Sequence, residues 1–312
     1  METTLEIALP VFGLVICGYL VGRSRIMDEA GIDGLANFVF YVAIPVLLFR
    51  TVMRSAVPEA GDLAILIAYF GGCFITFMLA YAVGRSMFRL PADELAIFGM
   101  GSMYGNTVML GIPMVHAVFG DAGLVPILLI VGFHNPFLIT CTAIFVEIGR
   151  GKKGGLRNVV RSSAATLVRN PVVVAIIIAL GWRQIDIPFW TPVDRFAELL
   201  GTAAAPTALF ALGASLAKYR LAGKLEESMA IVVLKLFVLP AVVWILATMV
   251  VQIDPLWAAV ATLAAAMPTG ANVFIYSRGY GLYVARATSA TLISTGISIA
   301  TVAVLLAWLA PR

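Results

Sequence analysis

Two long apolar segments of the chain are interrupted by the same kinds of polar and helix-breaking residues. The segment 105–115 reads GNTVMLGIPMV and contains Asn106, Thr107, Gly111 and Pro113. The segment 264–277 reads AAAMPTGANVFIYS and contains Pro268, Thr269, Gly270 and Asn272. Asparagine amides, threonine hydroxyls and backbone N–H groups released from a helix are hydrogen-bond donors that can hold an anion. We therefore take these residues as candidate binding residues.

The interruptions matter because of where they lie. Proline removes a backbone donor and glycine loosens a helix, so each segment is predicted to be kinked or unwound near its middle. Unpaired backbone groups are costly in hydrocarbon, so such a helix must be buried in protein or line a wet cavity. Two broken helices favour a substrate site between them, where half-helix N-termini face an anion. The alternative is that both are ordinary kinks whose asparagines bond neighbouring helices.

The composition of the chain indicates whether these segments fold in water or in a membrane. Of 312 residues, 61% are hydrophobic and 12% are charged, and the mean hydropathy is +1.00, which excludes an ordinary soluble protein. The segments lack the alternation of barrel strands, and most are long enough for a helix to cross about 30 Å of hydrocarbon. We expect an all-α integral membrane protein that contacts the lipid bilayer and no nucleic acid. Its ten transmembrane helices are predicted at about 5–22, 31–53, 61–84, 94–118, 122–148, 166–182, 196–217, 228–251, 256–277 and 283–309.

Basic residues are distributed unequally between the two ends of these segments. Fifteen lysines and arginines follow odd-numbered segments, and five lie on the opposite side. The positive-inside rule then places both termini outside the cytoplasm, in a cytoplasmic (inner) membrane. The basic linker 151–165 separates a first five-helix repeat, 1–150, from a second, 166–312, and the odd number inverts the second. The similar stretches PVLLF (45–49) and PTALF (206–210) support this 5+5 inverted repeat.

One basic residue, Lys235 in IVVLKLFVLP, lies inside an apolar segment. It either snorkels to the surface or faces the protein interior, where it could neutralise a carboxylate or bond carbonyls released by the second interruption. No Asp or Glu lies at mid-depth, and the three cysteines lack metal-like spacing, so we expect no metal site and no cofactor. HExxH and GxSxG motifs are absent, which argues against an enzyme.

The sequence also resembles a known family at these positions. GNTVMLGIP, AAAMPTGANVFIYSRGYG and ATSATLISTGISIAT resemble the auxin efflux carriers, which include PIN-type exporters and bacterial permeases for malate- and malonate-like acids. The resemblance implies a sodium/proton antiporter-like and bile-acid symporter-like fold in which broken helices four and nine cross. It implies a scaffold of spans 1, 2, 6 and 7 and a mobile core of spans 3, 4, 5, 8, 9 and 10.

The resemblance also implies which residues form the site. It places Asn106, Pro113, Pro268 and Asn272 at the crossover of the two broken helices. It implies a polar substrate contact in the fifth span, where GFHNPF offers His134 and Asn135.

These features together predict a secondary transporter of small organic carboxylate anions, such as auxin-like or malate/malonate-like acids. The expected mechanism is elevator-type alternating access, with the anion held by neutral donors. An anion channel or a membrane-embedded sensor are the alternatives. Gly18 and Gly22 have the spacing of a close helix contact, either within the scaffold or at the face of a possible homodimer.

Overall fold

The computed structural model describes residues 2–24, 26–54, 60–151, 170–185 and 189–309. Within these ranges every regular element is helical, apart from one isolated β-bridge. The described residues include three shorter apolar helices, Leu9–Ser24, Pro171–Gln184 and Pro255–Ala265. They also include six helical stretches long and apolar enough to cross a membrane, which are Glu29–Arg54, Gly61–Ser86, Thr107–Gly149, Thr191–Leu216, Leu225–Val250 and Val284–Leu309. The chain is therefore an all-helical, multi-pass membrane protein, as its composition predicts.

In the first half of the chain several apolar segments are assembled from more than one helical piece. One π-helical turn joins two helical pieces and another begins a piece, and short 3₁₀ turns lead into two more. The elements are α1 (Glu2–Ser24), α2 (Glu29–Phe38), η1 (Val39–Ala43), α3 (Ile44–Arg54), η2 (Ala60–Leu63), α4 (Ala64–Ser86), α5 (Ala92–Met103), η3 (Thr107–Gly111), α6 (Ile112–Phe119), η4 (Gly120–Gly123) and α7 (Leu124–Gly149).

The second half is built in the same way. Its first and eighth elements begin at a side-chain cap followed by proline, since Asn170 accepts from Val172 N and Asp254 accepts from Leu256 N. The elements are α9 (Pro171–Gln184), α10 (Thr191–Thr202), α11 (Ala204–Leu216), α12 (Leu225–Val233), η5 (Leu234–Val238), α13 (Leu239–Ile245), η6 (Leu246–Val250), α14 (Pro255–Ala265), α15 (Asn272–Tyr280) and α16 (Val284–Leu309). The linker predicted at 151–165 lies outside the described residues, apart from Gly151.

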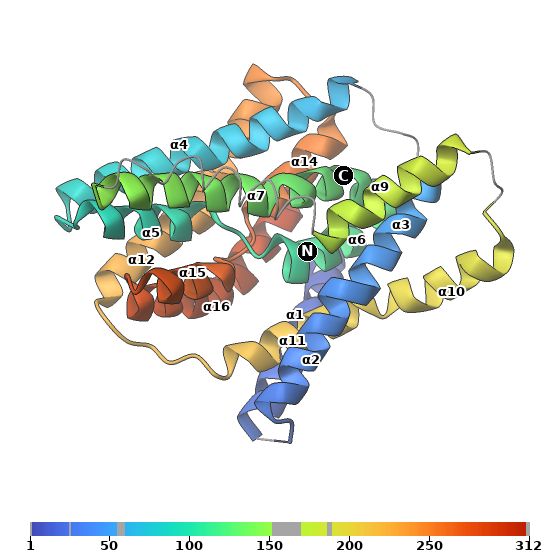
Figure 1. The fold of residues 1–312 in the computed structure, drawn as a ribbon, viewed down its shortest axis with the longest axis horizontal. Helices are drawn as coiled ribbons and strands as arrows, with labels where there is room; N and C mark the ends of the chain where they lie inside the picture. The colour runs from blue at the N-terminus through green and yellow to red at the C-terminus, as the bar shows by residue number, and fades with distance from the viewer. Residues whose placement is uncertain (1, 25, 55–59, 152–169, 186–188, 310–312) are drawn as a thin grey trace.

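The helices gather into two groups (Figure 1). Helices α4, α5, α7, α12, α15 and α16 lie together on the left of that view, and α2, α3, α9, α10 and α11 lie on the right. Within the second group α1 packs along α11, and α3 packs along α9. Gly18 and Gly22 face α11 so closely that a Cβ on Gly18 would overlap the Phe210 carbonyl, and one on Gly22 would lie 2.7 Å from the Ala214 oxygen. These two glycines therefore form a close helix contact between α1 and α11 of the same chain.

One apolar core runs through both groups of helices. It includes Phe12 of α1, Leu48 of α3, Phe98 of α5, Leu212 of α11 and Val302 of α16, all nearly inaccessible to solvent. Burying a polar group in such surroundings is costly unless it is hydrogen-bonded. Polar residues that lie inside this core are therefore candidates for a role other than packing.

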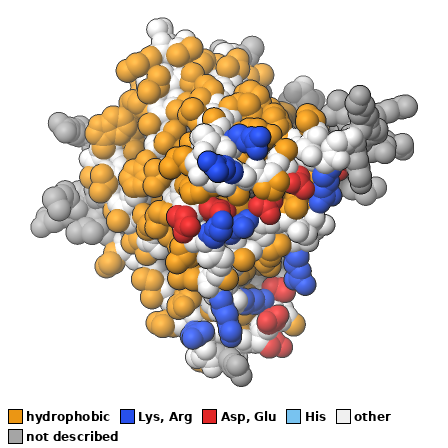
Figure 2. All heavy atoms as spheres, turned by 90° about the vertical axis from the view of Figure 1, so that its left-hand side faces the viewer, with side chains coloured by type: hydrophobic (Ala, Val, Ile, Leu, Met, Phe, Trp, Pro, Cys, Tyr) orange, Lys and Arg blue, Asp and Glu red, His pale blue; other side chains and the backbone are white. Residues whose placement is uncertain are grey.

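Charged side chains gather at one end of the first group, amid a largely hydrophobic surface (Figure 2). Arg286, at the start of α16, pairs with Glu94 of α5 at 2.9 Å and with Glu227 of α12 at 3.1 Å. The carboxylate of Glu227 is almost completely buried and accepts a hydrogen bond from Tyr283 Oη at 2.9 Å. Ion pairs of this kind tie the starts of three helices together, far from the interruptions described next.

Candidate functional site

The two interrupted segments meet at their breaks. Helix α5 ends at Met103 before η3 starts at Thr107, and α14 ends at Ala265 before α15 starts at Asn272. Asn106 N donates to the Pro268 carbonyl at 2.8 Å, and Gly270 N donates to the Tyr104 carbonyl at 3.0 Å. These bonds form the isolated antiparallel bridge between Gly105 and Thr269. Backbone groups released by one break are thus satisfied by the other, which removes the penalty of unpaired polar groups in an apolar interior.

Thr269 and Gly270 hold the second break in place. Thr269 Oγ1 donates to the Gly101 carbonyl at 3.0 Å, and its backbone N donates to Ser294 Oγ of α16 at 3.0 Å. Gly270 lies against the Tyr104 ring, where a Cβ would come within 2.9 Å of the ring carbons. We call the place where the two breaks meet through the Gly105–Thr269 bridge the crossing. Thr269 and Gly270 are both buried, so their part in the site is to shape this crossing.

A tyrosine that sequence reasoning missed links the polar residues of three elements. Asn272 Nδ2 of α15 donates to Tyr104 Oη at 2.5 Å, and Tyr104 Oη in turn donates to Asn135 Oδ1 of α7. The Tyr104 ring also stands edge-on to the His134 ring, with centroids 4.6 Å apart. Tyr104 immediately precedes the GNTVMLGIP motif, and its buried hydroxyl needs a partner, which is the signal that could have identified it.

Asn106 begins the second piece of the first interrupted helix. Its Oδ1 accepts a hydrogen bond from Met109 N at 3.3 Å, the arrangement of a helix N-cap. Its amide NH₂ has no partner among the described residues, and the side chain is only half-buried. Thr107 is buried, and its hydroxyl has no hydrogen-bond partner within the described part of the chain. The unused donors of these two residues therefore lie side by side at a helix N-terminus.

Lys235 lies at the crossing and does not reach the membrane surface. Its side chain is fully buried on the π-helical turn η5. Its Nζ donates to the Ala265 carbonyl at 2.6 Å, at the last residue of α14. A Cβ built on Gly105 would lie 3.3 Å from the same Nζ. The amine thus occupies the negative end of one half-helix and touches the bridge that joins the two breaks.

The remaining predicted residues lie farther along their helices. Gly111 ends η3, where its N–H donates to the Asn106 carbonyl at 3.1 Å, and a Cβ there would lie 3.4 Å from the Met267 side chain and 3.6 Å from that of Thr107. Pro113 is in the first turn of α6. His134 is buried in α7, and its Nε2 has no partner among the described residues. Pro113 lies beyond the crossing, whereas other predicted residues are brought together there or through Tyr104, namely Asn106, Gly111, Asn135, Lys235, Pro268, Thr269, Gly270 and Asn272.

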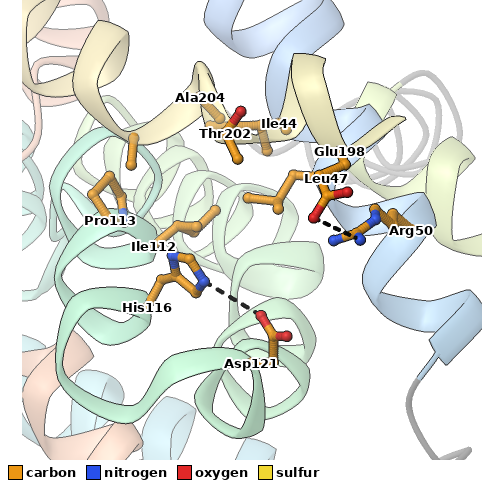
Figure 3. A pocket seen from close by; sticks show the side chains of 12 residues that line it. Ile44, Leu47, Arg50, Ile112, Pro113, His116, Asp121, Glu198, Thr202 and Ala204 are labelled. Atoms are coloured by element: carbon orange, nitrogen blue, oxygen red, sulfur yellow. Dashed lines mark ion pairs between the residues drawn. The ribbon is translucent and has the colours of Figure 1, made fainter. Parts of the chain in front are cut away.

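A cavity of about 150 Å³ opens beside Pro113, between α6 and helices of the second group (Figure 3). Its walls come from α3, α6, α10 and α11, and charged side chains of both signs line it. Arg50 Nη2 pairs with Glu198 at 3.1 Å, and His116 Nε2 lies 3.3 Å from Asp121 Oδ1 on the opposite wall. Arg50 Nε also pairs with Asp194 at 2.9 Å. Because each described basic side chain in its walls is paired with a carboxylate, the cavity does not offer unpaired positive charge to an anion.

The crossing offers an unusual combination of groups for a membrane interior. It has two asparagine amides, a tyrosine hydroxyl, a buried amine and two helix N-termini, and within the described residues no carboxylate forms an ion pair with Lys235. Hydrogen-bond donors and positive helix ends stabilise negative charge. The arrangement is chemically suited to a small anion.

Known membrane proteins are similar to this chain over nearly its whole length. The family described as "Membrane transport protein" matches residues 3–306. The chain is 31% identical over 304 residues to a Rhizobium meliloti (strain 1021) protein named "Putative malonate transporter", covering 96% of this chain and 94% of that protein. It is 25% identical over 309 residues to an uncharacterized transporter of Methanocaldococcus jannaschii, covering 96% of each. It is 27% identical over 326 residues to the Mus musculus lysosomal cholesterol signaling protein, covering 96% of this chain but 37% of that longer protein. The chain therefore belongs to the membrane transport protein family, the auxin efflux carrier family that its motifs resemble, and is a membrane transporter and not an enzyme.

Proposed function

We propose that the protein is a secondary transporter of small organic carboxylate anions, with malonate-like and auxin-like acids as the substrate class. The observation that carries the proposal is the crossing itself, where Asn106, Asn272 and Tyr104 surround a backbone bridge in contact with Lys235. The Rhizobium meliloti relative's name, which refers to malonate, supports the same class of substrate. In this proposal the amide of Asn106 and the hydroxyl of Thr107, which lack partners among the described residues, bind the carboxylate directly.

The remaining predicted residues have distinct parts in this proposed site. Asn272 and Asn135 are held by Tyr104, and Pro268, Thr269 and Gly270 keep the second break open. Pro113 and Gly111 keep the first broken helix from continuing as a regular helix through the site. His134 lies behind Tyr104 and takes no direct part in anion binding.

We further propose a 5+5 inverted repeat in which a scaffold and a mobile core move against each other. Two packing contacts support the repeat: the first helix of each half, α1 or α9, packs on the second segment of the other half, α11 or α3. The close glycine contacts of α1 with α11 favour a rigid scaffold of spans 1, 2, 6 and 7. The cavity beside Pro113 lies at the boundary with the proposed core, where movement would open or close access. Elevator-type alternating access is the corresponding mechanism.

The orientation in the membrane remains the one predicted from charge. We propose a cytoplasmic (inner) membrane location with both termini extracytoplasmic and the 151–165 linker cytoplasmic, since fifteen of the basic residues belong to that side. The charged end in Figure 2 would then face the cytoplasm. A homodimer through scaffold helices stays a prediction, and the Gly18–Gly22 face is not available for it because α11 covers that face.

A thermal-shift screen of purified protein tests the substrate class. We expect malonate and related carboxylates to raise the melting temperature in a saturable manner, because a ligand that binds only the folded state stabilises it. An indole acid tests the auxin-like alternative, and chloride at equal ionic strength controls for salt. Failure of every carboxylate to shift the melting temperature would contradict the proposal. An anion channel or a sensor is distinguished by flux, since only a carrier gives saturable, trans-stimulated exchange.

A further inference from the structure

Two basic side chains are buried close to each other behind the crossing. Lys235 is fully buried and His134 is 1% exposed, and both lie against the same short segment, since Lys235 Nζ lies beside Gly105 and the His134 ring stands against the Tyr104 ring. Neither forms an ion pair with a carboxylate in the ranges that the structure describes. A buried cation in a membrane protein normally has a partner of opposite charge. This pair lacks one in the absence of substrate.

The elements around the pair supply no compensating negative charge. The titratable groups that face it are hydroxyls and a thiol of α4 and the segment after α5, and α14 contains no ionisable side chain. Helices α5 and α16 carry their charges only at the charged end, where Glu94 pairs with Arg286. The facing groups are Tyr69 and Tyr104, whose rings lie against His134, and Cys73 of α4.

Hydrogen bonding does not compensate a charge there either. Of the three bonds that an ammonium can donate, Lys235 makes one, to the Ala265 carbonyl. His134 Nε2 and Tyr69 Oη have no partner within the described residues. An ammonium at Lys235 would therefore have only one carbonyl, at a helix C-terminus, to compensate its charge within the described residues, and a bound anion would supply the counter-charge that it lacks.

We propose that Lys235 takes up a proton when an anion binds at the crossing, so that the protein carries a carboxylate together with a proton. This inference rests on the proposed function, because the bound carboxylate supplies the missing counter-charge. The proton comes from water and bonds to the lone pair of Lys235 Nζ, and it returns to water when the anion leaves on the other side. His134 limits the uptake to one proton, since two adjacent buried cations repel each other.

Calorimetric titration of the detergent-solubilised full chain with malonate tests this inference. In buffers of different ionisation enthalpy, such as Tris and HEPES, the observed heat changes in proportion to the protons exchanged. We expect an uptake of about one proton per malonate near neutral pH for the natural sequence. Lys235→Met should bind malonate more weakly and show no uptake. His116→Gln is the matched control, because this half-exposed histidine pairs with Asp121 away from the crossing, and it should retain the full uptake.

The outcomes separate the two proposals. Malonate binding with heats that are the same in all buffers would overturn proton uptake and leave anion transport standing, and this holds for the natural sequence whether or not Lys235→Met folds. Absence of binding by malonate and every other carboxylate tested would overturn the proposed function instead. Lys235→Arg provides an independent check, because arginine stays protonated. Where it folds, it should bind malonate without proton uptake, and undiminished uptake would contradict the assignment to Lys235.

Discussion

Removing the Tyr104 hydroxyl should damage both the stability of this transporter and its proposed anion site. Tyr104→Phe deletes the oxygen that accepts from Asn272 and donates to Asn135, and it leaves the rings of residues 104 and 134 in contact. Each of the two hydrogen bonds contributes about 1 kcal/mol net, so the free energy of unfolding should fall by about 1–2 kcal/mol. The lower end is expected if the half-buried amides of Asn135 and Asn272 regain other partners.

The same substitution should weaken malonate binding. Without Tyr104 the Asn272 amide is no longer held in one orientation, and a loss of about 1–2 kcal/mol corresponds to a roughly 5-fold to 30-fold higher dissociation constant. Calorimetry and thermal shift in detergent measure both quantities on one sample. Tyr69→Phe is the matched control, because the Tyr69 hydroxyl is buried without a partner in the described structure and its removal should be neutral or stabilising. If Tyr104→Phe behaved like Tyr69→Phe in melting temperature and affinity, the hydroxyl would not organise the site.

Further substitutions test the other parts of the account. Asn106→Ala and Asn272→Ala should each weaken malonate binding by about 10-fold to 150-fold, because a hydrogen bond to a charged group contributes about 1.5–3 kcal/mol, and unchanged affinity in calorimetry would exclude them from the site. Pro113→Ala and Pro268→Ala should lower vesicle transport with equal or higher melting temperature, since a regular helix can then form across the break, whereas mutants that merely unfold would make the breaks structural kinks. Gly18→Val should destabilise the protein by about 1–3 kcal/mol, because a Cβ there overlaps the Phe210 carbonyl, and Gly13→Val, where the space around a Cβ is open, should not. A cysteine at position 153 on a cysteine-free background should react with an impermeant maleimide only from the cytoplasmic side, and labelling from outside would reverse the orientation.

The sequence was most informative where backbone chemistry is specific. Pro268 and Gly270 predict a break wherever they fall in an apolar helix, and α14 does end just before them, at Ala265. That the two breaks would pair through the bridge of Gly105 and Thr269 could not be read from either segment alone, because the partner of a released backbone group depends on the tertiary fold.

Side-chain roles were harder to predict for a related reason. Lys235 is about equally compatible with snorkelling and with burial in a pattern of leucines, and only its bond to the Ala265 carbonyl distinguishes them. The sequence does not single out Tyr104, because a tyrosine is unremarkable in a membrane helix until the structure places its hydroxyl between two asparagines. The spacing of Gly18 and Gly22 predicted a close contact, but the identity of its partner, α11, required the structure.

The most direct test of the central claim is counterflow of labelled malonate into vesicles that contain the purified protein. A carrier whose site lies at the crossing should give saturable uptake that unlabelled malonate inside the vesicles accelerates, and Asn272→Ala should require a higher malonate concentration for half-maximal uptake. Uptake by the natural protein that neither saturates nor responds to internal malonate, or uptake that Asn272→Ala leaves unchanged, would contradict the assignment of the crossing as the site of anion transport.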